Sequence, residues 1–272
     1  MVLCWIKGYN KRKMAKEMFN ILAFERREKI MHHLYRDKKA FVSTLAEEFK
    51  VTEETIRRDF EKMEKEGIVT RTYGGATLNL HTNEDLPYQT RNAINIEAKK
   101  NIASKMNELL HDGDTIMADT SSTVLESLKE IQLQKSKITL ITNSIIALQE
   151  FSNSSFTIIS TGGELRTKSM SLVGTVSAST VEHYNADIAL LSCKSLSMTH
   201  GITDSNDPEG DLKRNMAKKA TKVILLADHT KFDKVAFVKI MNFDQINCII
   251  TDQKPSKEWL EFLTSKSIEL IF

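Results

Sequence analysis

Seven short apolar runs, each separated from the next by a helix-length segment, constrain the fold of most of this chain. The runs are rich in β-branched residues, which is typical of strands that are buried on both faces. Strands that alternate with helices form βαβ units and a mainly parallel sheet covered by helices. The predicted strands are Thr115–Ala118, Ile138–Thr142, Thr157–Ser160, Ile188–Ser192, Val223–Ala227, Ile246–Thr251 and Ile268–Ile271.

The sheet accounts for only part of the 272 residues, so a second domain is expected before it. No apolar run approaches the roughly 18 residues that a membrane-spanning helix needs. The three cysteines are widely spaced and form no Cys-x-x-Cys pair, which argues against a disulfide framework and a cysteine zinc site. We therefore expect a cytoplasmic protein without contact with a membrane.

Charge is distributed unevenly between the two parts. Residues 1–80 hold 17 Lys and Arg against 12 Asp and Glu, a net charge of +5, whereas the remaining 192 residues carry −3. A basic segment is typical of nucleic-acid binding, although many helical modules reach this excess by chance. The predicted organisation is a flexible basic tail (1–23), a DNA-binding domain (24–80), a linker (81–98) and an α/β domain (99–272). Because Met14 and Met18 precede the first periodic segment, a further hypothesis is that translation begins at one of them.

Three helices are predicted in the basic part. The apolar residues of the first recur at helical spacing and end near Asp37. Ser43 is predicted to cap a second, short helix, and Thr52 a third. The third helix is expected to stop at Gly67. The second and third helices are separated by a short turn before Thr52, and two helices joined in this way indicate a helix-turn-helix.

The third helix is predicted to turn Thr55, Arg57 and Arg58 outward. Arginine suits a major-groove reader because its planar guanidinium can bond two acceptors of guanine or a phosphate at once. The alternative is that both arginines form surface ion pairs with Glu53 and Glu54, one turn away. The sequence that follows favours the DNA interpretation.

A β-hairpin is predicted after the third helix, from Ile68 to Leu78. Its β-branched residues flank a predicted turn at Gly74-Gly75. A helix-turn-helix followed by a hairpin is a winged helix. Arg71 and Tyr73 are then expected where a wing meets the sugar-phosphate backbone.

The stretch from Arg26 to Leu78 contains T-E-E-T-I-R-R-D at 52–59 and R-T-Y-G-G-A at 71–76. It resembles the N-terminal domain of the DeoR family of bacterial transcriptional regulators. The resemblance implies that the third helix is the recognition helix. The predicted DNA-binding residues are Ser43, Thr52, Thr55, Arg57, Arg58, Arg71 and Tyr73.

Polar residues follow the ends of the predicted strands, where parallel sheets gather their binding sites. Hydroxyls and free N–H groups at the start of a helix, together with glycines and lysines, suit the phosphate of a phosphorylated polyol. A Ser/Thr run before a helix is otherwise an ordinary cap. The effector-binding residues predicted from these positions are Asp119, Thr120, Ser121, Ser122, Thr123, Asn143, Gly162, Gly163, Lys194 and Lys231.

This half resembles the C-terminal sensor domain of the same family, which is similar in fold to ribose-5-phosphate isomerase. The matching motifs include D-T-S-S-T at 119–123, T-G-G-E-L-R at 161–166 and A-D-H-T-K-F at 227–232. An ungapped count places Lys213 at the position similar to the catalytic Glu of the isomerases, although a small shift would place Glu209 or Asp211 there. Lys194 and Lys213 in place of acids are expected to hold an anion without turnover.

The sequence therefore predicts a homo-oligomeric regulator, dimer or tetramer, that represses carbohydrate genes and is released from a double-stranded operator by a phosphorylated sugar. The linker around Leu86 to Arg91 is expected to carry the coupling. No catalytic residue, cofactor or metal is predicted, since the histidines are scattered without a ligand pattern. Two alternatives remain: a sugar-phosphate isomerase with an appended DNA-binding domain, and a regulator of the same kind with an unphosphorylated effector.

Overall fold

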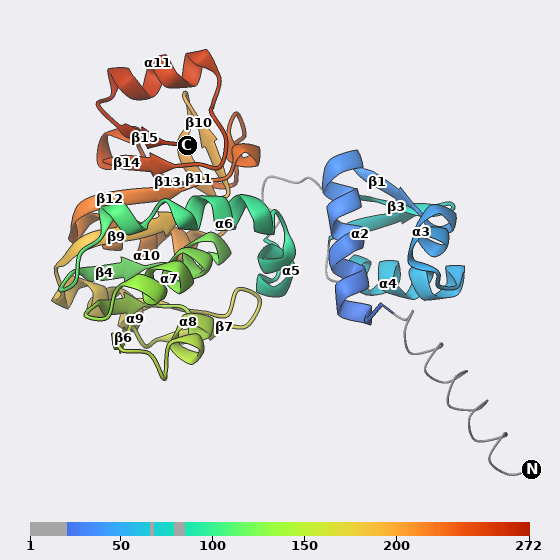
Figure 1. The fold of residues 1–272 in the computed structure, drawn as a ribbon, viewed down its shortest axis with the longest axis horizontal. Helices are drawn as coiled ribbons and strands as arrows, with labels where there is room; N and C mark the ends of the chain where they lie inside the picture. The colour runs from blue at the N-terminus through green and yellow to red at the C-terminus, as the bar shows by residue number, and fades with distance from the viewer. Residues whose placement is uncertain (1–20, 66–67, 79–84) are drawn as a thin grey trace, which may run out of the picture. The chain divides into compact units, whose positions relative to one another are not determined.

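The computed structural model describes residues 21–65, 68–78 and 85–272. Most of the predicted basic tail, both alternative starts and the predicted stop at Gly67 lie outside these ranges. The chain divides into two compact units, Met1–Leu80 and His81–Phe272. The ribbon in Figure 1 shows the elements of each.

The first unit contains three helices and three short strands among its described residues. Its apolar core is formed by the faces that the helices turn inward, with Ile30, Leu45, Ile56 and Phe60 at most 1% exposed. The elements are α2 (Ala23–Asp37), β1 (Lys39–Phe41), α3 (Val42–Phe49), α4 (Glu53–Lys65), β2 (Val69–Thr72) and β3 (Gly75–Leu78). They form the predicted winged helix, with one strand that was not predicted from the sequence.

The additional strand, β1, pairs with β3 and places it at the centre of an antiparallel sheet of order β1-β3-β2. The hairpin turn was also predicted wrongly. It consists of Tyr73 and Gly74, whereas Gly75 is the first residue of β3 and pairs with Phe41 on one side. A Cβ atom at Gly75 would overlap the carbonyl oxygen of Ala40. Gly75 is thus needed for the close approach of two strands, while Gly74 supplies the positive φ of the turn, +82°.

The second unit is built around a seven-stranded sheet of order β15-β14-β12-β9-β4-β5-β6, in which every neighbouring pair is parallel. All seven predicted strands are present in it. Their bounds are β4 (Thr115–Ala118), β5 (Thr139–Thr142), β6 (Thr157–Ser160), β9 (Ala186–Ser192), β12 (Ala220–Leu226), β14 (Cys248–Ile250) and β15 (Glu269–Ile271). The fold class is confirmed.

Alternate residues of the strands enter two separate cores, one on each face of the sheet. Met117 packs into one core with residues of α9, α10 and α11, and Ile116 packs into the other with residues of α6, α7 and α8. This is why the strands read as continuous apolar runs. The helices are α6 (Ile96–Ser104), α7 (Ser122–Gln134), α8 (Ile145–Glu150), α9 (Thr175–His183), α10 (Asp207–Lys218) and α11 (Lys257–Ser265).

Several short elements surround the carboxyl ends of the strands, and sequence periodicity did not reveal them because each has only three or four residues. Two are the hairpin strands β7 and β8, and three form the antiparallel sheet β10-β11-β13. Their bounds are β7 (Glu164–Arg166), β8 (Ser171–Val173), β10 (Ser195–Ser197), β11 (Gly201–Asp204) and β13 (Val238–Met241), and the 3-10 turn η2 (His229–Lys231) follows β12. Two further 3-10 turns, η1 (Asn107–Leu109) and η3 (Phe243–Gln245), precede β4 and β14.

The predicted linker is shorter than the sequence indicated. Its second half forms α5 (Tyr88–Ala93) and the beginning of α6, and both belong to the second unit. The ring of Tyr88 is only 5% exposed and its backbone N–H donates to Lys168. Burial of this aromatic ring explains why the segment is ordered. No helix in the described parts of the chain has the length and apolarity to cross a membrane.

Candidate nucleic-acid interface and effector site

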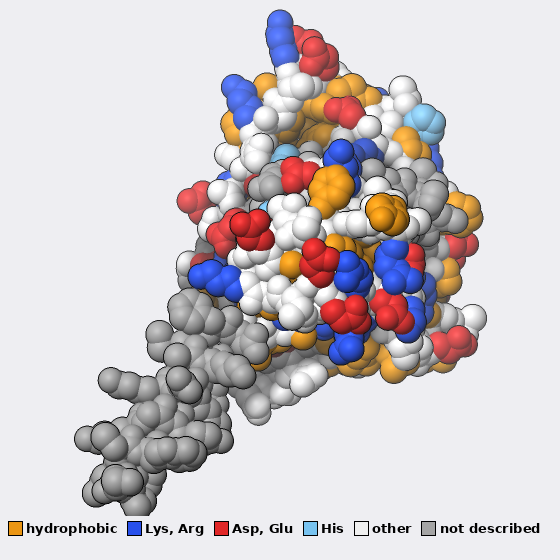
Figure 2. All heavy atoms as spheres, turned by 90° about the vertical axis from the view of Figure 1, so that its right-hand side faces the viewer, with side chains coloured by type: hydrophobic (Ala, Val, Ile, Leu, Met, Phe, Trp, Pro, Cys, Tyr) orange, Lys and Arg blue, Asp and Glu red, His pale blue; other side chains and the backbone are white. Residues whose placement is uncertain are grey.

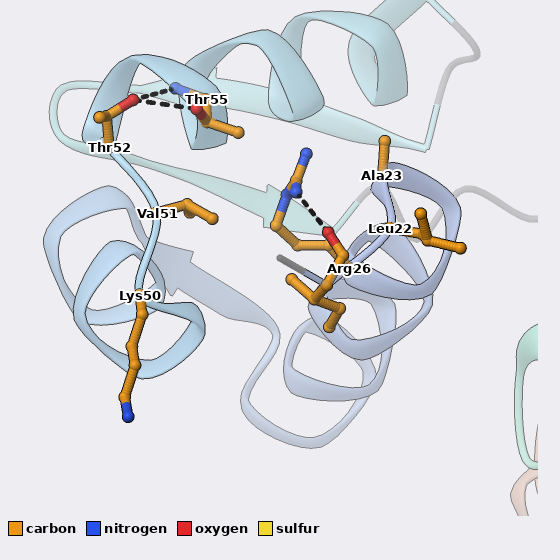
Figure 3. A pocket seen from close by; sticks show the side chains of 8 residues that line it. Leu22, Ala23, Arg26, Lys50, Val51, Thr52 and Thr55 are labelled. Carbon is orange, nitrogen blue, oxygen red and sulfur yellow. Dashed lines mark hydrogen bonds between the residues drawn. The ribbon is translucent and has the colours of Figure 1, made fainter. Parts of the chain in front are cut away.

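The turn between α3 and α4 presents the N-terminus of α4 at the surface. Lys50 ends α3 in the left-handed conformation, with φ of 54°. The hydroxyl of Thr52 accepts from the N–H of Thr55 at 3.3 Å and lies 2.9 Å from the Thr55 hydroxyl, as the dashed lines in Figure 3 show. The prediction that Thr52 caps the helix is confirmed. Ser43 is not a cap, because α3 begins one residue before it, at Val42, with Phe41 as its N-cap.

A buried ion pair fixes α4 against α2. The guanidinium of Arg26 donates through Nε to Asp59 at 2.5 Å and through Nη1 to the carbonyl of Ile21 at 3.2 Å. Arg26 and Asp59 are 7% and 5% exposed. Because α4 is tied down on this side, its opposite face points away from the core.

That opposite face carries Arg57 and Arg58, whereas Thr55 is half-buried on the side of Asp59, one turn away. Arg57 contacts Glu53 at 2.5 Å and Arg58 contacts Glu54 at 3.3 Å, which are the surface pairs of the alternative interpretation. Exposed pairs of this kind contribute little to stability, typically about 0.3–0.5 kcal/mol, so a phosphate or base can replace the glutamates. Figure 2 shows acidic side chains interspersed among the basic ones on the face it presents.

The wing places Tyr73 at the tip of the β2–β3 turn, fully exposed at 107% of its reference area. Arg71 lies beside it and contacts Glu64 of α4 at 2.6 Å, and the same glutamate accepts from the Arg71 N–H at 2.9 Å. These two hydrogen bonds hold the pKa of Glu64 below its ordinary value. The wing is thereby joined to α4.

A hollow of about 560 Å³ lies between the start of α2 and the start of α4. Figure 3 shows Arg26 pointing into it and Lys50 pointing away from it. Its lining residues are Ile21, Leu22, Ala23, Arg26, Lys50, Val51, Thr52 and Thr55. Both nitrogen contacts of Arg26 are internal, so the hollow adds no separate site.

In the second unit, Asp119 lies directly after β4 and organises the strand ends around it. It is 3% exposed and accepts hydrogen bonds from the N–H and hydroxyl of Ser121, at 2.8 and 2.9 Å, and from the N–H of Ser192, at 3.2 Å. These bonds shape the loop between β4 and α7. Asp119 is thus a buried structural acceptor at the centre of the strand-end cluster.

Lys213 does not face an open anion site, so its predicted role was wrong. Its Nζ atom lies 3.0 Å from Asp119 and 2.5 Å from Asp204, and donates to the carbonyl of Ser192 at 2.8 Å. Although burial opposes the charged forms, the two carboxylates raise the pKa of Lys213, and Lys213 lowers that of Asp204. The charge of Lys213 is therefore neutralised inside the protein.

Glu209 and Asp211, the alternatives for the shifted position, do not replace Lys213 in this cluster. Glu209 accepts from the hydroxyl of Ser171 at 2.8 Å and from Arg166 at 3.1 Å. Asp211 pairs with Arg214 on the exposed side of α10.

Two hydroxyls of the Ser/Thr run at the start of α7 donate hydrogen bonds to backbone carbonyls of the protein. Thr120 donates to the carbonyl of Ser169 at 3.2 Å and Ser122 to that of Arg91 at 3.2 Å. The backbone N–H groups of residues 122–124 occupy the first turn of the helix, where no intrahelical acceptor exists, and they donate to no acceptor elsewhere in the described residues. Unpaired N–H groups at the start of a helix favour an anion.

The remaining predicted residues have mixed roles. Gly162 and Gly163 have positive φ, +63° and +108°, which favours glycine at both positions. A Cβ at Gly163 would also overlap α9, so Gly163 is needed for local packing. Asn143 is 2% exposed and donates to the carbonyl of Leu172, but its Oδ1 has no partner. Lys231 is half-buried on η2, and Lys194 follows β9.

Cys193 and metals add no chemistry to the site. Burial raises the pKa of the Cys193 thiol to about 12, so the thiol is protonated and inert at neutral pH. No group of three or more His, Cys, Asp or Glu within the described ranges could hold a metal ion.

Three polar residues on α5 and α6 were not predicted as part of the site. Lys99 is 4% exposed and donates to the carbonyls of Arg91, Asn92 and Ile94. Asn95 donates to Asp228 and Thr230 after β12, at 3.4 and 3.3 Å. Arg91 was assigned to the linker. The spacing of these three residues in the sequence does not indicate a site, because they belong to a segment that was not expected to pack against the sheet.

The two units therefore define a class of protein: a winged-helix unit joined to an α/β unit with buried polar residues at the ends of its parallel strands. The DeoR-like helix-turn-helix domain matches residues 26–82, and the DeoR C-terminal sensor domain matches residues 94–253. The chain belongs to the DeoR family of transcriptional regulators, which are not enzymes.

Relatives match over most of their length. The HTH-type transcriptional regulator GolR of Listeria innocua is 35% identical over 235 residues, which cover 86% of this chain and 92% of the relative. The glycerol-3-phosphate regulon repressor of Escherichia coli is 28% identical, over 86% of this chain and 93% of its own. Ribose 5-phosphate isomerase A of Methanocaldococcus jannaschii has a TM-score of 0.38 at 16% identity, over 51% of this chain and 55% of its own. No activity follows from that last likeness.

Proposed function

We propose that this regulator is a cytoplasmic repressor of carbohydrate-metabolism genes, released from its operator by a phosphorylated sugar. The observation that carries the DNA half is the capped N-terminus of α4, which exposes Arg57 and Arg58 while Asp59 anchors the opposite face. The predicted contacts Ser43, Thr55, Arg71 and Tyr73 flank it. A relative that is a repressor of a glycerol-3-phosphate regulon supports the repressor role and a phosphorylated effector.

The effector half rests on the first turn of α7. Its N–H groups and the positive end of the helix dipole favour an anion, and they follow a strand end where ligands of parallel sheets bind. The second unit also assembles the homo-oligomer in this proposal. In a symmetric dimer, two recognition helices meet half-sites about 34–36 Å apart, or multiples of that. An effector that binds the DNA-incompetent arrangement about 100-fold better supplies about 2.7 kcal/mol of coupling.

Replacing Arg57 or Arg58 by Ala is expected to weaken operator binding by about 1–3 kcal/mol if the side chain reads a base. A phosphate contact would instead weaken binding to all sequences and lower the salt slope by about one. Fluorescence anisotropy on specific and scrambled DNA at several salt concentrations measures both.

The matched controls are Glu53→Gln and Glu54→Gln. If the arginines contact DNA, removing their acidic partners keeps or strengthens binding, because the guanidinium is freed and a negative charge leaves the interface. Equal losses from the Arg and Glu variants would show that the pairs act only within the helix.

Thr123→Glu is expected to abolish the response to a phosphosugar and spare operator binding, because a carboxylate at the start of α7 repels the ligand phosphate. Thr123→Gln, of the same size without the charge, is expected to retain more of the response. Operator release by a phosphosugar panel measures this difference. Loss of the response in both variants would attribute it to crowding, and a response retained by Thr123→Glu would favour an unphosphorylated effector.

A further inference from the structure

Arg91 on α5 has an unusual environment for an arginine. Its Nε donates to the carbonyl of Leu86 at 3.2 Å, and its guanidinium lies over the ring of Tyr88, 5.8 Å from the centroid. The Nη2 atom is buried without a hydrogen-bond partner. No described carboxylate forms an ion pair with it. A buried guanidinium nitrogen without an acceptor is costly, so this atom is available to donate to an oxygen of a ligand.

Most of the charged groups around the strand ends have partners within the protein. The buried carboxylates there include Asp119, Asp204 and Asp228, and the cations include Arg91, Lys99, Lys213 and Lys231. Lys213 satisfies the first two carboxylates, and Lys231 lowers the pKa of Asp228 although burial opposes it. Lys99 is satisfied by backbone carbonyls. Among these cations, Arg91 is the one with a buried side-chain nitrogen that has no hydrogen-bond partner.

The backbone of Arg91 lies next to the anion-binding turn. Its carbonyl accepts from the hydroxyl of Ser122, the first residue of α7. Its charge also reaches the strand-end cluster. Burial and the neighbouring Lys231 lower the pKa of Lys99 to about 7, and Arg91 contributes to that shift and, more weakly than Lys213, to the lowered pKa of Asp204.

We propose that Arg91 binds the phosphate of the effector together with the first turn of α7, and that the ligand thereby fastens α5. The assignment rests on the proposed function. It deepens that function by naming a binding residue that lies between the two family matches, which end at residue 82 and resume at residue 94.

The position of α5 in the chain gives this contact a regulatory consequence. α5 is the first described helix after the segment that joins the two units. Just before it, Asp85 contacts Arg166 of β7 at 2.6 Å, and Arg166 also contacts Glu209 of α10. The end of the linker is thus held by the same strand-end elements that surround the site. A ligand that fixes Arg91 restricts the linker directly, without a relay through the core.

Titration calorimetry on the full chain tests the assignment, with glucose 6-phosphate, fructose 6-phosphate, glycerol 3-phosphate and inorganic phosphate as probes. Arg91→Met removes the guanidinium at similar length, and Arg91→Lys keeps the charge but not the planar fork. Arg214→Met on α10 is the matched control, since Arg214 pairs with Asp207 and Asp211 away from the strand ends. Anisotropy on the upstream DNA reports whether each variant still folds and binds its operator.

We expect Arg91→Met to lower the affinity for the probe that the wild type binds best by about tenfold or more. The affinity of Arg91→Lys should lie between those of Arg91→Met and the wild type, and the affinity of Arg214→Met should equal that of the wild type. The ligand concentration needed for operator release should rise in parallel. Binding by Arg91→Met within twofold of wild type overturns the assignment and leaves the proposed function standing. A wild type that binds operator but none of the probes overturns the phosphosugar proposal itself. If Arg91→Met fails to fold, the affinity of Arg91→Lys for the probe is the test. An affinity equal to that of the wild type overturns the assignment, and a lower affinity supports it.

Discussion

Lys213→Met is expected to lower the free energy of unfolding by about 3–5 kcal/mol, because it leaves two buried carboxylates without their shared cation. Lys213, Asp119 and Asp204 are 4%, 3% and 8% exposed, so water cannot replace the ammonium. Urea unfolding followed by circular dichroism and by the fluorescence of buried Trp259 measures the loss. A loss below about 1 kcal/mol would contradict the role assigned to Lys213.

The free energy of unfolding that Lys213→Met removes should depend on pH. In the wild type, Lys213 holds the pKa of Asp204 below its ordinary value, so Asp204 contributes stability at neutral pH that disappears as the pH falls through its folded pKa. Without Lys213, burial raises that pKa and the carboxylate destabilises the fold at neutral pH. The difference between variant and wild type should therefore narrow as the pH falls below about 5.

A combined variant, Lys213→Met with Asp119→Asn and Asp204→Asn, provides the control. It removes all three charges together, and replacing a buried charged set by neutral groups is often nearly neutral for stability. We expect it to be more stable than Lys213→Met alone. Equal instability would assign the effect to lost packing of the lysine stem instead of unpaired charge.

Gly75→Ala is expected to lower the stability of the first unit by about 3 kcal/mol and to abolish operator binding. The new Cβ would overlap the carbonyl oxygen of Ala40 and lie 3.3 Å from the Cα of Phe41, both on the paired strand β1. Backbone atoms cannot rotate away, so the strands must separate and the wing must shift. Thermal unfolding and anisotropy on operator DNA measure the two effects.

Gly74→Ala is the matched control in the adjacent position. Gly74 has φ of +82°, but a Cβ added there would have no atom within 4 Å beyond its chain neighbours. Ala at this position therefore meets backbone strain of about 1–2 kcal/mol and no clash. Operator binding should survive. If the two variants behaved alike, the close approach of β3 and β1 would not be the reason for Gly75.

The parallel sheet could be predicted from sequence because each buried strand reads as a continuous apolar run. The runs ending at Ala118 and Ser160 match the observed strands at both ends, although the second of these strands, β6, lies at the edge of the sheet and is only partly buried. The strand β1 could not be found in this way, because three residues carry no periodicity and Lys39 and Phe41 are exposed. Its presence depends on pairing with β3, more than 30 residues later.

The strand-end residues were predicted by position but not by role. Asp119 and the serines that follow it do lie at the end of β4, yet Asp119 serves as a structural acceptor. Lys213 was assigned to an anion because its partner Asp204, on β11, was not recognised as buried beside it. Local sequence indicates which residue types are present, whereas tertiary packing decides which charges neutralise each other.

In the proposed function, a phosphorylated sugar controls the affinity of this regulator for DNA. Fluorescence anisotropy of the purified full chain on its own upstream DNA, at fixed salt and with a panel of phosphorylated sugars, tests it most directly. We expect tight, sequence-specific binding that one phosphosugar releases. Specific binding that is indifferent to every member of the panel would contradict the assignment of the effector, and the absence of specific binding would contradict the proposed function as a whole.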